Sequence, residues 1–280
     1  MLAERSLAAP IVTVTGHDYA FIAPDTIPSG ATTFRFIDRG KFAHHLVVFR
    51  LEAGVSLSDF LRSMGDGGKS PAGIASLGGL QSDKIYRGAA ANTPSARRAR
   101  ELTIDLKPGR YVLACLHSED SVTHLQKGMM RSLTVIPAKR AAARPKFDAT
   151  ITMSDYDYAV SGNFSSGRRT IRLANAGPQE HHVFIQTMRA GKSLADIKAH
   201  RIARAKERQA ALPDSLSTLI PPMMPLTAVT RMSPGEEVFL TLDLVAGDYR
   251  LFCLVPDAGD GKPHTEHGMD QLVRVGAVKR

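Results

Sequence analysis

The chain repeats itself, and this repeat limits its possible fold more than any other feature. Residues 29–60, SGATTFRFIDRGKFAHHLVVFRLEAGVSLSDF, match residues 166–197, SGRRTIRLANAGPQEHHVFIQTMRAGKSLADI, at a constant offset of 137. The match resumes where residues 102–115 align with residues 240–253, at an offset of 138. Because the offset changes so little, the insertions fall in loops, and the repeated unit has the length of a whole domain. The 280 residues therefore predict a duplicated domain, with enough chain for two cores.

The domain limits follow from the repeat and from one change in composition. Residues 138–146 are basic and rich in Ala and Pro, which is typical of a linker. We therefore assign residues 1–137 to a first domain, residues 138–146 to a linker and residues 147–280 to a second domain.

Regular stretches within each copy predict strands. Apolar and polar residues alternate with period two, and Val, Ile, Phe, Tyr and Thr are frequent. In the first copy these stretches are residues 11–15, 32–37, 46–51, 102–106, 111–116 and 130–136. The segments that begin at Ser56 and Ser193 differ, because each serine precedes an aspartate by three residues, which predicts the N-cap of a helix. The Gly- and Pro-rich residues 65–79 and 221–225 are expected to lie in the loop excursions around these helices.

Each copy ends in a loop that carries three side chains able to bind a metal. They are Cys115, His124 and Met129 in the first copy, and Cys253, His264 and Met269 in the second. A thiolate, an imidazole and a thioether are soft-to-borderline ligands, and this combination favours copper. The chain has two cysteines, one in each copy, and we do not expect them to approach within the roughly 7 Å that a disulfide requires.

Each copy also carries a histidine pair in an earlier strand, His44-His45 and His181-His182. A type 1 copper site combines one cysteine and two histidines with a weak axial methionine, so one member of each pair would complete a site. Side chains alternate across a strand, and counting from the first histidine places apolar residues inward in both copies. Counting from His182 instead places Gln186 inward. The pattern favours His44 and His181, with His45 and His182 as alternates.

Other side chains near the loops are weaker candidates. They are His117, His267 and Met130. His117 lies too close to the cysteine along the strand, and His267 leaves no loop before the methionine. Met130 more naturally begins the following strand.

The chain resembles the cupredoxins, or blue copper proteins. The spacing Cys-x8-His-x4-Met of the first copy is similar to the ligand loop of copper nitrite reductases, and Cys-x10-His-x4-Met in the second copy is a longer version. The phrase VPDAGDGKPHTEHGM resembles a loop of bacterial plastocyanin-like proteins. The resemblance covers residues 11–276 apart from the excursions. It implies an all-β protein of two Greek-key cupredoxin-like β-sandwiches in tandem, each with a short helical insertion, and up to two type 1 coppers per chain.

These features favour an electron-transfer protein over an enzyme. Cycling between Cu(II) and Cu(I) requires a suitable ligand set and a histidine near the surface, but no substrate pocket. Copper nitrite reductases and multicopper oxidases resemble this chain in domain count, yet they place a histidine directly beside the cysteine. Here Ala114 and Leu116 flank the first cysteine, and Phe252 and Leu254 flank the second. The alternative is a metal-free or copper-sequestering structural or binding module, and the two enzyme classes are less favoured.

Charge and hydropathy limit the partners. The formal net charge of +9 comes from dispersed basic residues without aromatic interleaving, so we do not expect nucleic-acid binding. The same charge would steer an acidic redox partner protein. No run approaches the roughly 18 apolar residues of a membrane span. The sequence as given begins without a signal peptide, so a periplasmic or secreted location is an expectation from the resemblance.

Overall fold

Strands dominate the structure, a computed structural model that describes residues 8–65, 73–81, 101–119, 121–211 and 217–277. The elements of the first half are β1 (Ile11–His17), β2 (Ala20–Ile22), β3 (Thr26–Pro28), β4 (Gly30–Asp38), β5 (His45–Leu51), α1 (Leu57–Gly65), β6 (Ile74–Gln81), β7 (Glu101–Leu106), β8 (Gly109–Ala114), β9 (Ser118–Glu119), β10 (Val122–Thr123) and β11 (Met130–Ile136). Those of the second half are β12 (Ala149–Ser154), β13 (Asp157–Gly162), β14 (Gly167–Asn175), β15 (His181–Met188), α3 (Leu194–Gln209), β16 (Met223–Met232), β17 (Glu237–Leu244), β18 (Gly247–Phe252), the 3-10 helix η4 (His264–His267) and β19 (Asp270–Val275).

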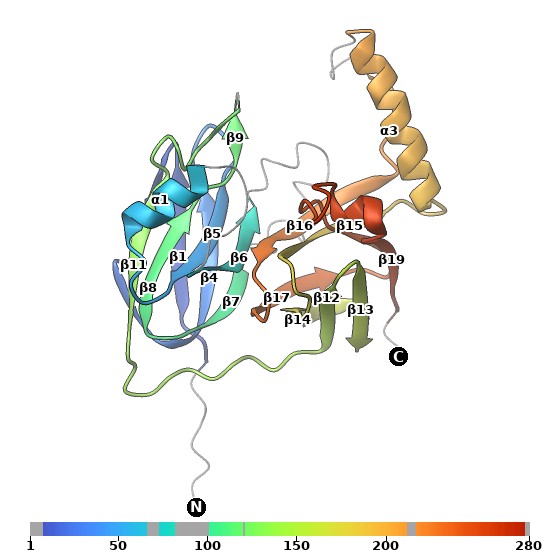
Figure 1. Cartoon of the computed structure of the whole chain (residues 1–280). Coiled ribbons are helices and arrows are strands. Elements are labelled where there is room, and N and C mark those ends of the chain that lie inside the picture. Colours follow the sequence, from blue (N-terminus) through green and yellow to red (C-terminus); the bar gives the residue numbers. More distant parts are fainter. Residues whose placement is uncertain (1–7, 66–72, 82–100, 120, 212–216, 278–280) are drawn as a thin grey trace, which may run out of the picture.

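Each half is a β-sandwich with one α-helix among its described residues, so the predicted fold class is confirmed (Figure 1). The sequence did not predict how the halves join. One eight-stranded sheet has the order β13-β12-β14-β17-β7-β4-β1-β2, and one nine-stranded sheet has the order β19-β18-β15-β16-β6-β5-β8-β11-β3. Both sheets therefore run without interruption from one half into the other.

The junction has an approximate two-fold symmetry. Strand β7 pairs with its repeat counterpart β17 in antiparallel fashion, and Leu102 lies directly opposite Leu240. These two leucines are themselves equivalent at the repeat offset of 138. In the other sheet β6 pairs with its counterpart β16, with Leu80 opposite Val229. Such pairing of a surface with its own equivalent is the arrangement of an isologous dimer interface.

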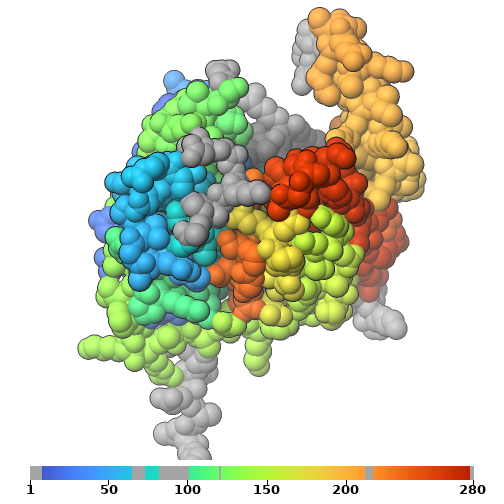
Figure 2. Space-filling view, in the orientation of Figure 1, coloured from blue at the N-terminus to red at the C-terminus, as the bar shows by residue number. Residues whose placement is uncertain are grey.

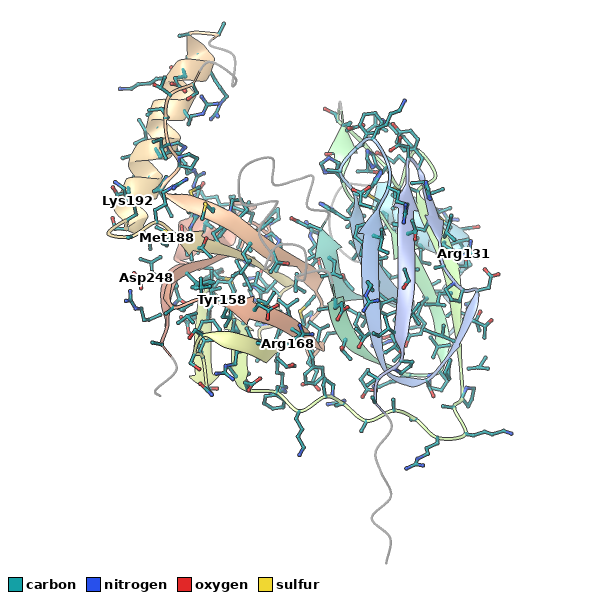
Figure 3. All side chains as sticks on the ribbon, turned by 180° about the vertical axis from the view of Figure 1, so that it is seen from behind. Arg131, Tyr158, Arg168, Met188, Lys192 and Asp248 are labelled. Carbon is teal, nitrogen blue, oxygen red and sulfur yellow. The ribbon has the colours of Figure 1, made fainter. Side chains whose placement is uncertain are left out.

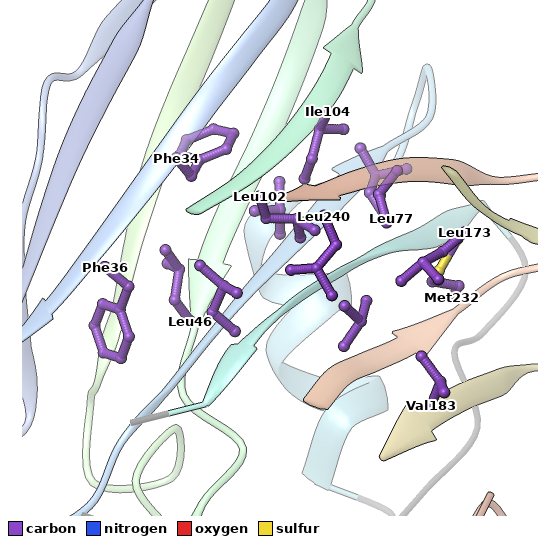
Figure 4. Packing of buried hydrophobic residues seen from close by; sticks show 14 of the residues in the cluster. Phe34, Phe36, Leu46, Leu77, Leu102, Ile104, Leu173, Val183, Met232 and Leu240 are labelled. Carbon is purple, nitrogen blue, oxygen red and sulfur yellow. The ribbon is translucent and has the colours of Figure 1, made fainter. Parts of the chain in front are cut away.

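The buried core is continuous across this junction. A single cluster of buried hydrophobic residues draws on both halves, and Leu102 and Leu240 lie near its middle, 1% and 0% exposed (Figure 4). A second, smaller cluster lies on the other face of β5, where Phe60 of α1 packs edge-to-face against Phe49 with ring centroids 5.2 Å apart. Helix α1 therefore covers the outer face of the first half.

The expectation that residues 65–79 and 221–225 lie in loop excursions is wrong in part. Residues 74–79 belong to β6 and residues 223–225 belong to β16, the two strands that join the halves. Glycine is needed in β6 because a Cβ atom on Gly79 would lie 2.0 Å from the carbonyl oxygen of Leu46. A glycine-rich sequence that resembles a loop is here a strand in very close backbone contact with its neighbour. Residues 66–72 of the predicted excursion lie outside the described residues.

Both helices begin where the sequence predicts. At α3, Ser193 accepts a hydrogen bond from the amide of Asp196, and the aspartate side chain accepts one from the serine amide, which completes a capping box. Ser56 and Asp59 make the same exchange before α1. Helix α3 is longer than α1 and projects beyond the sheets (Figure 1). None of the described helices is long and apolar enough to cross a membrane.

Candidate metal centres

The first candidate site brings together one cysteine and two histidines. The Nδ1 atoms of His44 and His124 lie 2.9 Å apart, and the Cys115 Sγ atom lies 3.9 Å from the first and 3.6 Å from the second. All three side chains are fully buried. His44 lies just before β5, Cys115 just after β8, and His124 just after β10, so three separate segments converge on one point.

The second candidate site repeats this arrangement. The Nδ1 atoms of His181 and His264 lie 3.1 Å apart, and Cys253 Sγ lies 3.5 Å from Nδ1 of His264. One ligand atom from each of the three residues lies within 4.8 Å of the others in both sites. A thiolate with two imidazoles suits copper, and the converging Nδ1 and Sγ atoms fit that metal.

The methionine of each loop is tied to its site through the backbone. Cys115 donates its amide to the carbonyl of Met129, and Met129 donates its amide to the carbonyl of His124. Cys253, Met269 and His264 make the same two bonds. Both methionine side chains are fully buried in the main core. The loops differ in length by two residues, yet they close in the same way.

Each thiol is buried and accepts a hydrogen bond from a backbone amide. Burial raises the pKa of the Cys115 thiol and of the Cys253 thiol to about 11. The amide of His45 donates to Cys115 Sγ at 3.2 Å, and the amide of His182 donates to Cys253 Sγ at 3.5 Å. Hydrogen bonds to a sulfur favour its anionic form and oppose the effect of burial. A metal must therefore displace a proton from each thiol to bind there.

Carboxylates stand behind the imidazoles of the first site. Burial lowers the pKa of His44, which keeps the ring neutral and able to bind a metal through nitrogen. Asp18 Oδ1 lies 3.4 Å from Nε2 of His44, and Glu119 Oε2 lies 3.4 Å from Nε2 of His124. Neither contact is a hydrogen bond, and the Nε2 atoms of His44 and His124 have no hydrogen-bond partner among the described residues.

The second site has one shorter contact of the same kind. Asp155 Oδ1 lies 2.7 Å from Nε2 of His181, within hydrogen-bond distance. Burial lowers the pKa of His181, and Asp155 opposes that shift. Asp257 Oδ2 lies 3.9 Å from Nε2 of His264. A carboxylate behind a ligating imidazole fixes its orientation and increases its donor strength, so His181 is the most strongly supported of the four imidazoles.

The loop histidines are not at the surface, which differs from the sequence-based expectation. His124 and His264 are each 0% exposed. Tyr19 covers His124 edge-on, with ring centroids 5.2 Å apart, and Tyr156 covers His264 in the same way at 5.3 Å. The Tyr156 hydroxyl donates to Asp257 at 2.6 Å, so the cover over the second site is fixed by a charged acceptor.

The alternate histidines lie on the other side of their strands. His45 and His182 contribute their backbone amides to the thiols, as described above, and their side chains are absent from the two convergent groups. The rings of His45 and His182 instead line a cavity of about 330 Å³ between the halves. Of the weaker candidates, His117 stacks edge-on against His124 at 5.3 Å, and His267 stacks on Tyr156 at 4.7 Å.

Residue-by-residue reasoning missed the carboxylates and tyrosines around the sites, although the repeat contained their signal. The dipeptide Asp18-Tyr19 recurs as Asp155-Tyr156 at the offset of 137. An acidic residue also stands four positions after each cysteine, as Glu119 and as Asp257. These positions lie outside the two long matching segments, and carboxylates and tyrosines are not among the ligand types that mark a type 1 copper site.

The structure consists of two β-sandwiches, and each contains a buried group of one cysteine and two histidines. The chain is a tandem cupredoxin-fold protein. This assignment confirms the resemblance seen in the sequence and rests on the strand order and on the two His-Cys-His groups.

Comparisons with known proteins give remote similarities to this tandem cupredoxin-fold chain. No family model matches it, and no curated protein matches it. Among solved structures, auracyanin of the photosynthetic bacterium Roseiflexus castenholzii is 19% identical, covering 45% of this chain and 94% of its own, with a TM-score of 0.28. The copper-containing nitrite reductase of Thermus scotoductus is 14% identical, covering 96% of this chain and 62% of its own, with a TM-score of 0.23. That of Nitrosomonas europaea is 13% identical, covering 96% and 93%, with a TM-score of 0.24.

Proposed function

We propose that the protein binds one type 1 copper in each half and transfers single electrons. The observation that carries the proposal is the pair of equivalent, fully buried groups in which a cysteine sulfur and two Nδ1 atoms converge within 4.8 Å. One such group could be accidental packing of polar residues, but the same arrangement in both halves, with the same backbone bonds, supports a preserved metal-binding role.

The ligands of the first site would be His44, Cys115 and His124, with Met129 as a weak axial ligand. Those of the second would be His181, Cys253, His264 and Met269. Bound copper would supply a one-electron couple between Cu(II) and Cu(I). The chain's own contribution is to hold the ligands in a dry core and to present hydrogen bonds to each sulfur. Both features limit rearrangement and set the reduction potential.

The two sites would differ in potential. The short hydrogen bond between Asp155 and His181 makes that imidazole a stronger donor than His44, whose carboxylate lies at 3.4 Å. A stronger donor stabilises Cu(II) over Cu(I). The hydrogen-bond partners of the two covering tyrosines differ in charge as well. Tyr19 accepts a hydrogen bond from Lys127, whereas Tyr156 donates one to Asp257. These two differences lower the potential of the second site, whereas the first site has an additional buried carboxylate, because Asp38 Oδ1 lies 3.9 Å from Nε2 of His44.

Titration of the metal-free protein with Cu(II) tests the proposal. Type 1 sites give an intense visible band from charge transfer between thiolate and copper. We expect the band to saturate at two equivalents. We expect Cys115→Ser and Cys253→Ser each to remove one equivalent of it, and the double variant to remove it completely. A protein that shows no such band at two equivalents of copper would contradict the proposal and leave the structural or copper-sequestering module. A periplasmic or secreted location is part of the proposal, on the strength of the cupredoxin resemblance.

A further inference from the structure

Helix α3 is an arm with almost no packing of its own. Of its sixteen residues, Leu194–Gln209, only Ile197 is buried. Figure 2 shows the helix standing out beside the surface formed by the residues near the C-terminus, and Lys192 in Figure 3 marks its base. Its counterpart α1 is shorter and buries Phe60 completely against the sheet. An isolated helix with so little apolar burial gains most of its stability only when another surface packs against it.

A groove of about 1090 Å³ lies between α3 and the loop of the second candidate site. The body of the protein lines it with Leu254, Pro263 and Thr265, among others. These residues are immediate neighbours of the site, because Leu254 follows Cys253, and Pro263 and Thr265 flank His264. Thr265 also donates its amide to the carbonyl of Cys253 at 3.0 Å. The floor of the groove is therefore one residue away from the sulfur and from the loop histidine.

The groove also gives a partner protein a closer approach to the second site than the surface over Tyr156 does. His264 is fully buried beneath Tyr156, whereas Leu254 is 42% exposed within the groove. A redox centre that docks in the groove would contact the residue that follows Cys253 and the residues on both sides of His264.

The charge of the groove is positive. Lys198, Arg201 and Arg208 line it from α3 and are all exposed to solvent. Its other arginines are paired within the chain. Arg250 makes two bonds of 2.6 Å to Asp270, and Arg204 pairs with Glu207. Two acidic residues line the groove: Asp270 is the partner of Arg250, and Glu266 is exposed. Three exposed basic side chains and one exposed acidic side chain therefore leave an excess of positive charge beside the second site.

We propose that this groove is the docking surface for an acidic redox protein that donates one electron to the second site. The inference rests on the proposed function and specifies where electrons enter. The partner's centre is oxidised by one electron and Cu(II) is reduced to Cu(I), with no bond made or broken in either protein. A protein partner fits better than a nucleic acid or an anionic membrane, because the basic residues of α3 line one side of a groove whose floor includes residues of the ligand loop.

The test compares two charge-reversal variants of the copper-loaded full chain. Lys198→Glu/Arg201→Glu changes the groove, and Lys139→Glu/Lys146→Glu makes the same change of charge at exposed residues of the connection between the halves. The probe is the reduced, acidic soluble domain of cytochrome b5. Its rate of oxidation is followed by stopped-flow absorbance at low and at high ionic strength.

We expect the groove variant to react about tenfold more slowly than wild type at low ionic strength, since complementary charge raises association rates by about 10–10³. Salt should reduce the difference, and the variant in the connection should stay close to wild type. Equal rates for the two variants would overturn the inference. So would a loss in the groove variant of binding to a single-stranded oligonucleotide or to anionic vesicles with no loss in electron transfer.

Reduction of the wild-type protein by ascorbate separates this inference from the proposed function. Ascorbate is small and does not need the docking surface. If ascorbate does not bleach the copper band, the electron-transfer function itself fails. If ascorbate bleaches the band and the two variants react equally with the cytochrome, only the docking surface fails.

Discussion

Replacement of Asp155 by asparagine tests whether the carboxylates behind the imidazoles control metal binding. The Asp155 carboxylate lies 2.7 Å from Nε2 of His181, and the equivalent Asp18 lies 3.4 Å from Nε2 of His44. Removal of a carboxylate that supports a ligating histidine typically costs about 10–100-fold in metal affinity. We expect Asp155→Asn to lower the copper affinity of the second site by that amount. We expect Asp18→Asn to lower that of the first site by less than about tenfold.

Each variant is best measured with the other site removed. Asp155→Asn is combined with Cys115→Ser, and Asp18→Asn is combined with Cys253→Ser, so that the visible band reports one site only. Affinity is obtained by competition with a chelator of known strength, and the reduction potential by titration of the same band. The potential of the second site should rise, because a weaker donor stabilises Cu(II) less. An Asp155→Asn variant with unchanged affinity and potential would refute this account of the short contact.

Three further predictions concern the thiols, the junction and the glycine strand. The pKa of both Cys115 and Cys253 is raised to about 11, so these thiols are protonated in the metal-free protein at neutral pH. Copper affinity should therefore rise about tenfold per pH unit between about pH 6 and pH 8, and a slope near zero in a chelator competition would contradict the raised values. Leu240→Ala should cost about 2–5 kcal/mol of unfolding free energy, and calorimetry should still show one transition; two transitions of which only one shifts would show that the halves unfold independently. Gly79→Ala should destabilise the protein by at least about 1–3 kcal/mol in denaturant titrations, whereas Gly276→Ala, whose Cβ meets open space, should have no effect.

The sequence predicted the strands and the groups of candidate ligands because both depend on short-range patterns. Alternation along the strand that ends at Cys115 places Tyr111 and Leu113 on the same side as the thiol, and all three lie in the main core. The choice of His44 over His45 used the same rule, and His44 is the residue whose ring meets the cysteine. A repeat adds strength to such reasoning, because each inference must hold in two places.

The junction between the halves could not be predicted in this way. Strand β6 contains Gly78 and Gly79, and local propensity assigns such a stretch to a loop. Only contact with β5 and β16, which are distant in the sequence, makes it a strand. The supporting carboxylates raise the same difficulty, because Asp155 reaches His181 from a turn 26 residues earlier.

The direct pairing of Leu102 with Leu240 has a consequence for the edges of the two sheets. Either half alone would expose one strand of each sheet as an unpaired edge, and such edges recruit another chain. Two copies of one half would cover those edges by the same isologous contact that the fused chain makes. Within the one polypeptide, the two halves thus cover each other's edges as the two subunits of a homodimer would. Because each half covers the edges of the other, neither sheet needs a second chain at this junction, and the halves can differ elsewhere, as they do in helix length and in the distance from carboxylate to imidazole.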